Sequence, residues 1–170
     1  MSEVYWITGL SGAGKTTIGK LVYEKLKEEY SNTVFLDGDV LREVFGGDLG
    51  YGKEERKQCA MRYSRLCAML QRQDINVVCC TISMFHSVRE WNRGHIHNYR
   101  EIYIKASWET LQKRDQKGLY SGAKAGKEDL VVGIHMEFEK PQCPDLVLLN
   151  DGQKSPEEQA RVILSHTYQC

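Results

Sequence analysis

Short runs of apolar and β-branched residues alternate along the chain with longer stretches of helical periodicity. The short runs predict strands at Val4 to Thr8, Val34 to Asp37, Asn76 to Thr81, Ile102 to Lys105 and Leu146 to Leu149. The longer stretches predict helices at Lys15 to Glu29, Glu54 to Arg72, Val88 to Asn98, Ser107 to Arg114 and Ser155 to Ser165. Strands that alternate with helices are typical of a parallel sheet covered on both faces. We therefore expect a three-layer α/β fold with a parallel sheet of about five strands.

The segment from Asp115 to Pro144 breaks this alternation, because it is rich in Gly and Lys and lacks sustained periodicity. A connection of this length in a compact domain is usually functional or disordered. We predict that it forms a mobile lid, and a plain surface loop is the alternative.

Length and charge limit the classes of protein to consider. The 170 residues, 41% of them hydrophobic, suit one domain over residues 1–170. Lys plus Arg equals Asp plus Glu at 23 each, so no overall field would attract nucleic acid or an acidic membrane surface. The N-terminus has no basic region followed by an apolar stretch, and no apolar run is long enough to span a bilayer. We expect a cytoplasmic protein with no nucleic acid and no membrane as partner.

A phosphate-binding pattern lies between the first predicted strand and the first predicted helix. Gly9-Leu10-Ser11-Gly12-Ala13-Gly14-Lys15-Thr16 fits G-x-x-x-x-G-K-[ST] in the context that this motif requires. Its glycines let backbone N–H groups close around phosphate oxygens, and the helix N-terminus adds a favourable dipole. Lys15 is expected to reach the β- and γ-phosphates of ATP, and Thr16 to hold Mg²⁺. The motif predicts the P-loop NTPase fold.

Two carboxylates follow the second predicted strand, in Leu36-Asp37-Gly38-Asp39. They lie at the carboxyl edge of the sheet, where open α/β folds bind ligands. One carboxylate can accept the proton of an acceptor hydroxyl while the other supports the water shell of the metal. An ordinary Asp-Gly turn is the alternative.

Switch GTPases share the phosphate loop and are the alternative from another class of protein. Asp115-Gln116-Lys117-Gly118 fits their D-x-x-G pattern, but it follows a predicted helix instead of a strand. The guanine-reading pattern N-K-x-D does not occur in the sequence. A small-molecule kinase is therefore favoured. A switch should hydrolyse GTP slowly, whereas a kinase needs an acceptor to turn over.

From Val4 to about Ser165 the chain resembles the adenylylsulfate kinases, which phosphorylate the ribose 3′-hydroxyl of adenylyl sulfate with Mg-ATP. The resemblance is carried by Gly9 to Thr17, Leu36 to Asp39 with Arg42, Asp48 to Tyr51, Arg56, Ile82-Ser83, Lys113 to Asp115, Lys117 to Tyr120, and Pro141 with Pro144 to Leu146. It covers nearly the whole chain. The resemblance implies ATP as phosphoryl donor, Mg²⁺, a small-molecule nucleotide acceptor and a homodimer.

The resemblance also implies roles for individual residues. The catalytic group would comprise Lys15, Asp37, Asp39 and Ser83, with Thr16 and Asp37 beside the metal. ATP would contact Gly9, Ser11, Gly12, Ala13, Gly14, Lys15, Thr16, Thr17 and Arg114. The acceptor would contact Arg42, Tyr51, Arg56, Cys59, Ser83, Lys117, Leu130 and Val131. Two guanidinium groups, those of Arg42 and Arg56, suit the anionic group of such an acceptor.

The chain departs from the family pattern at the expected acceptor site. Tyr51 stands where a phenylalanine is usual, Cys59 where an asparagine is usual, and residues 127–133 contain none of the usual second aromatic. Stacking on an aromatic ring is worth about 1–3 kcal/mol per base, so losing one ring disfavours adenine unless another aromatic, such as Phe138, replaces it. We favour a pyrimidine conjugate, cytidine diphosphoramidate, used in bacterial capsule decoration. Adenylyl sulfate is the alternative.

Overall fold

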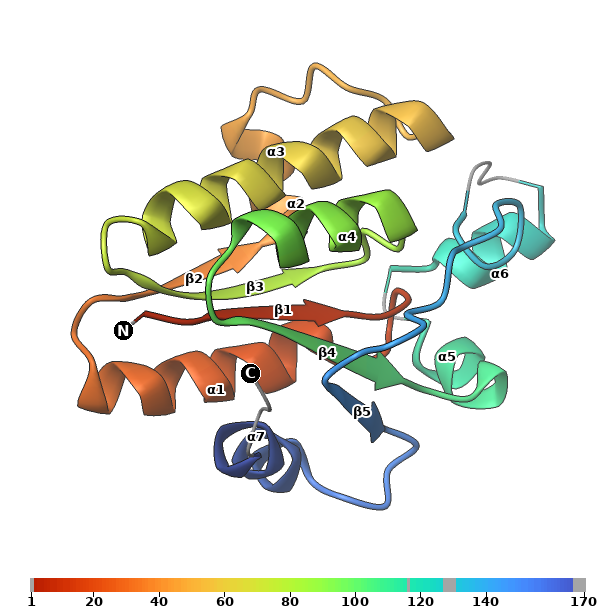
Figure 1. Cartoon of the computed structure of the whole chain (residues 1–170). Helices are drawn as coiled ribbons and strands as arrows, with labels where there is room; N and C mark the ends of the chain where they lie inside the picture. Colours follow the sequence, from red (N-terminus) through yellow and green to blue (C-terminus); the bar gives the residue numbers. More distant parts are fainter. Residues whose placement is uncertain (1, 116, 127–130, 167–170) are drawn as a thin grey trace.

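The fold is built on a sheet of five parallel strands in the order β2-β3-β1-β4-β5 (Figure 1). It is seen in a computed structural model that describes residues 2–115, 117–126 and 131–166. The strands are Val4–Thr8 (β1), Thr33–Asp37 (β2), Asn76–Thr81 (β3), Tyr99–Lys105 (β4) and Leu146–Leu149 (β5). The predicted α/β fold is confirmed, and β1, which leads into the phosphate loop, is the middle strand.

Helices cover both faces of the sheet (Figure 1). They are Lys15–Glu29 (α1), Gly38–Val44 (α2), Lys53–Gln71 (α3), His86–His95 (α4), Trp108–Arg114 (α5), Leu119–Lys124 (α6) and Pro156–Ser165 (α7). α1 and α7 pack against each other below the sheet in this view, whereas α2, α3 and α4 lie above it. No helix among the described residues is long and apolar enough to cross a membrane.

Alternate residues of β1 belong to two hydrophobic cores, one on each face of the sheet. Tyr5 and Ile7 pack in the core that α1 and α7 share. Val4 and Trp6 pack in the core beneath α3 and α4. All residues of β1 are buried, as expected for a central parallel strand. The phosphate loop is therefore attached to the most deeply buried part of the sheet.

Several elements differ from the sequence-based expectation. Helix α4 ends at His95 instead of Asn98, because β4 begins at Tyr99 and pairs there with β1. Helix α2 was not expected, and neither was α6 in the segment from Asp115 to Pro144. The Asp115 carboxylate accepts hydrogen bonds from the backbone N–H groups of Tyr120 at 2.9 Å and Ser121 at 3.1 Å, which stabilises the start of α6. Helices of six or seven residues are too short to show a clear period.

Candidate active site

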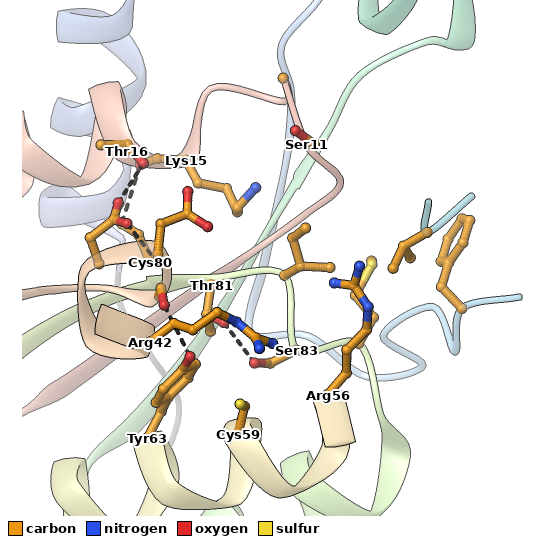
Figure 2. Close-up of a pocket in the computed structure, with 18 of the residues that line it drawn as sticks. Ser11, Lys15, Thr16, Arg42, Arg56, Cys59, Tyr63, Cys80, Thr81 and Ser83 are labelled. Carbon is orange, nitrogen blue, oxygen red and sulfur yellow. Dashed lines mark hydrogen bonds between the residues drawn. The ribbon is translucent and has the colours of Figure 1, made fainter. Parts of the chain in front are cut away.

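One pocket at the carboxyl edge of the sheet unites most of the predicted site residues (Figure 2). Its phosphate-loop end is lined by Ser11, Gly12, Gly14, Lys15, Thr16, Thr17, Asp37 and Asp39. Its other end is lined by Arg42, Tyr51, Arg56, Cys59, Ser83 and Lys117. Figure 2 shows Lys15 and Thr16 on one side of the pocket and Arg42 and Arg56 on the other. We call these the donor end and the acceptor end, after the roles that the sequence predicts for their residues.

The phosphate loop turns sharply at two glycines between β1 and α1. Gly12 and Gly14 have φ angles of 81° and 101°, which side chains with a Cβ rarely adopt. A Cβ on Gly14 would also collide with the side-chain amide of Asn150. Helix α1 begins without a side-chain cap, so its first N–H groups can bind phosphate oxygens.

The loop is supported from behind by residues near the end of the chain. Asn150, directly after β5, donates from Nδ2 to the Ala13 carbonyl at 2.8 Å. Gln159 of α7 donates from Nε2 to Asn150 Oδ1 at 2.7 Å. Arg114, expected at the nucleotide, donates to the carbonyls of Gly12 at 3.2 Å and Asn150 at 2.8 Å. Asn150 and Gln159 were not predicted, although a polar residue directly after a strand at this edge was a usable signal.

Two further expected nucleotide contacts, Gly9 and Ala13, lie deeper. Ala13 is buried, and a Cβ on Gly9 would collide with the Ile104 carbonyl. Both residues therefore shape the phosphate loop through close backbone packing.

Lys15, Thr16 and Asp37 meet at the start of α1. Lys15 Nζ donates to the Leu10 carbonyl at 2.8 Å, and burial lowers the pKa of this amine to about 8. Thr16 Oγ1 donates to Asp37 Oδ2 at 2.8 Å (Figure 2). Hydroxyl and carboxylate oxygens are the ligands that Mg²⁺ prefers. No three His, Cys, Asp or Glu side chains within the described part of the chain could hold a metal together. Mg²⁺ at this point would need phosphate oxygens and water to complete its shell.

Asp39 lies beside this corner, in the first turn of α2. Its backbone N–H donates to Asp37 Oδ1 at 3.0 Å, so Asp37 caps the helix that carries Asp39. The Asp39 carboxylate is exposed to the pocket and pairs with Lys117, which lies just before α6. The segment after Asp115 therefore contacts Asp39 through Lys117.

Ser83 is held at the floor of the pocket, after β3. Its hydroxyl and that of Thr81 lie 2.6 Å apart, and its φ angle is 30° (Figure 2). Tyr63 of α3 donates from its hydroxyl to the Gly38 carbonyl at 3.0 Å. Neither Thr81 nor Tyr63 was predicted. Their hydrogen bonds fix the two turns that carry Ser83 and the paired carboxylates.

The two predicted arginines pack around Tyr51. The guanidinium carbons of Arg42 and Arg56 lie 4.3 and 5.1 Å from the centre of the Tyr51 ring. Arg42 Nη1 donates to the carbonyls of Leu49 at 2.7 Å and Gly50 at 2.9 Å, and Arg56 Nε donates to that of Tyr51 at 2.7 Å. These contacts bring all three predicted side chains to the acceptor end, with the arginines also ordering the loop that carries Tyr51.

The wall of the acceptor end differs from the expectation. Cys59 of α3 lines it as predicted. Val131, however, is buried in the core on the α1 side and does not line the pocket, and Leu130 lies outside the described residues. The wall is formed instead by Val132, Met136, Glu137 and Phe138. An aromatic residue of the segment after α6 is therefore present at this end.

A phosphate loop after the first strand of a five-stranded parallel sheet, with two carboxylates beside it, defines a P-loop kinase. Comparison with known proteins narrows the class. The sequence profile of the adenylylsulphate kinase family matches residues 1–149. The chain thus belongs to this family, and it is an ATP-dependent kinase of hydroxyl groups.

Proteins similar to this chain in sequence are named for two different acceptors. The chain is 43% identical to a cytidine diphosphoramidate kinase of Campylobacter jejuni, covering 95% of this chain and 94% of that protein. It is 40% identical to an adenylyl-sulfate kinase of Halothermothrix orenii, covering 93% and 85%. A solved structure of the APS kinase of Mycobacterium tuberculosis with AMPPNP and APS has a TM-score of 0.88 and 31% identity, covering 96% and 95%.

Proposed function

We propose that this kinase transfers the γ-phosphoryl group of ATP to the ribose 3′-hydroxyl of cytidine diphosphoramidate. The observation that carries the proposal is the composition of the acceptor end of the pocket. Tyr51 and two arginines lie there, but Val131, near the position of the family's second ring, is buried in the core. The ring of Tyr51 with two guanidinium groups beside it suits a small base with an anionic tail. The similarity to a protein named cytidine diphosphoramidate kinase supports the same acceptor.

The chemistry proposed for the donor end follows from charge and position. Lys15, at the start of α1, would neutralise charge that develops on the β- and γ-phosphate oxygens. Thr16 and Asp37 would hold Mg²⁺ together with phosphate oxygens, and the ion would supply further charge neutralisation there. Ser83 would contact the reacting groups from the pocket floor, and Arg114 would act through the phosphate loop.

Asp39 would accept the proton of the acceptor hydroxyl. In a loose phosphoryl-transfer transition state the proton leaves late, so a weakly basic carboxylate is sufficient. Before the acceptor binds, the Asp39 carboxylate is paired with Lys117. Lys117 would then contact the anionic groups of the bound nucleotides, because it lines the same pocket.

Adenylyl sulfate is the second candidate acceptor, and one observation favours it. Phe138 lines the acceptor end together with Tyr51. Two rings on one pocket could hold an adenine between them. The adenylyl-sulfate kinase and APS kinase relatives agree with this alternative.

The deciding experiment compares both acceptors at one ATP concentration. We expect kcat/KM to be at least about tenfold higher for cytidine diphosphoramidate, with phosphorus NMR assigning the new phosphate to the 3′-oxygen. A tenfold preference for adenylyl sulfate would replace the first candidate by the second. Omission of Mg²⁺ should abolish turnover with either acceptor. The predicted homodimer is tested by the mass measured in solution, and the predicted cytoplasmic location by fractionation of cells.

A further inference from the structure

One wall of the acceptor end is formed by residues 136–138, and the backbone that follows this wall contacts a buried side chain of α4. Met136, Glu137 and Phe138 form this wall and lie in an extended segment with no strand pairing of its own beyond a single bridge at Val132 and Met136. In Figure 2 the pale blue ribbon of the segment passes beside Arg56. Backbone hydrogen bonds within residues 131–136 and the burial of Val131 hold the first part of the segment. The part directly after Phe138 is held by contacts with other elements.

Arg89 of α4 contacts the backbone immediately after the wall. Its Nη2 donates to the Glu139 carbonyl at 2.7 Å and to the Lys140 carbonyl at 3.3 Å. Arg89 is only 4% exposed, and its Nε lies 3.6 Å from Oε1 of the buried Glu101. A planar guanidinium can hold two carbonyls and face a carboxylate at once, whereas an ammonium group cannot reproduce this geometry.

Glu139 is fixed by two more contacts on the same side of the sheet. Its backbone N–H donates to the Met84 carbonyl at 3.2 Å, and Met84 itself lines the pocket. Its carboxylate accepts a hydrogen bond from the backbone N–H of His86, the first residue of α4. Three separate bonds therefore hold the residue next to Phe138.

A second arginine of α4 shares the same carboxylate but acts further along the chain. Arg93 Nη2 lies 3.2 Å from Glu101 Oε2 and donates to the Cys143 carbonyl at 2.8 Å. It also pairs with Asp145 at 3.3 Å. Arg93 thus stabilises the approach to β5, five residues beyond Phe138 in the sequence. Its partners Glu101, Cys143 and Asp145 are not among the described residues that line the pocket.

We propose that Arg89 is a positioning residue for acceptor binding, which it promotes by fixing the wall formed by residues 136–138. This inference rests on the proposed function, because it assigns the wall to the acceptor and not to ATP. A wall displaced by about 1 Å is enough to weaken binding of a closely fitted ligand. Arg89 does not line the pocket itself and acts on it through the backbone of Glu139 and Lys140.

The experiment compares Arg89→Lys with Arg93→Lys in the full chain. We expect Arg89→Lys to raise the acceptor KM about fivefold or more, with the KM for ATP within about twofold of wild type. Arg93→Lys removes a guanidinium from the same carboxylate and serves as the matched control, so its acceptor KM should stay within about twofold. Equal increases in the two variants, or parallel increases in the KM for ATP and acceptor, would overturn the proposal.

Two measurements keep the proposal testable if Arg89→Lys folds poorly or if neither acceptor is a substrate. Glu139→Ala removes the bond to His86 without uncovering a buried charge, and it should also raise the acceptor KM selectively. Hydrogen exchange needs no substrate: amides of residues 136–140 should exchange faster in Arg89→Lys than in Arg93→Lys. Unchanged exchange would refute the positioning role, whereas absence of turnover with faster exchange would refute only the proposed acceptor.

Discussion

The support of the phosphate loop by Asn150 gives a prediction whose size can be worked from the structure. In Asn150→Ala, the buried carbonyl of Ala13 and the Nε2 group of Gln159 both lose their partner. A buried polar group left unsatisfied costs about 1–3 kcal/mol, which gives about 2–6 kcal/mol for the two groups together. Water entering the new cavity would bring the cost toward the lower limit. We expect the free energy of unfolding to fall by about 2–3 kcal/mol.

Gln159→Met is the informative comparison, because it breaks one of the same two hydrogen bonds. Gln159 is fully buried, and its Oε1 has no hydrogen-bond partner among the described residues. Methionine has a similar length and removes that unsatisfied acceptor while it also removes the bond to Asn150. The two effects oppose each other, so the expected cost is only about 1 kcal/mol or less.

Urea unfolding followed by tryptophan fluorescence measures both costs, and steady-state kinetics measures the effect on the loop. Asn150→Ala should raise the KM for ATP about tenfold and leave the acceptor KM within about twofold, because the Ala13 carbonyl belongs to the donor end. A cost in Gln159→Met equal to that of Asn150→Ala would refute the assignment of the unsatisfied Oε1. Parallel changes in both KM values would refute the local role of Asn150.

Three more predictions follow from single contacts. Burial lowers the pKa of Lys15 to about 8, and a bound phosphate favours the charged amine, so ATP binding near pH 8 should be accompanied by proton uptake. Calorimetry in buffers of different ionisation enthalpy measures this uptake, which should be absent in Lys15→Met. Asp39→Asn should lower kcat about a hundredfold or more, and near-normal turnover would exclude Asp39 as the base. Gly19→Ala should destabilise the fold by about 1–3 kcal/mol in urea unfolding, because the new Cβ would collide with Cys80 Sγ. Adding Cys80→Ala should recover most of that loss.

The parts of the site that could be predicted are those defined by short stretches of consecutive residues. The phosphate loop is a fixed pattern between a strand and a helix, and the paired aspartates directly follow a strand. Parallel topology then brings both to one edge of the sheet without any knowledge of side-chain contacts. Tyr51 and the two arginines were reached by resemblance, and the structure shows that their side chains pack against one another.

The unpredicted residues act through partners that are distant in sequence. Asn150 supports Ala13 from 137 residues away, and Arg89 holds Glu139 from 50 residues away. The periodicity of the sequence cannot predict such pairs, because within its own segment each of these residues resembles any other polar residue. The burial of Val131 was not predicted for a related reason. The sequence shows that the usual aromatic residue is missing in this region, but only the packing shows that the valine belongs to the core.

The two ends of the pocket are held by different parts of the molecule, and we therefore expect donor binding and acceptor choice to be separable. The phosphate loop is attached to the central strand and supported by Asn150 and Arg114, whose bonds lie within the region of β5, α5 and α7. The acceptor wall instead depends on α4 and on the few polar bonds made by Arg89 and Glu139. We therefore expect substitutions in residues 136–138 to change the KM for the acceptor with little effect on the KM for ATP. Such a division between the two ends would allow one family to include both a cytidine diphosphoramidate kinase and an adenylyl-sulfate kinase.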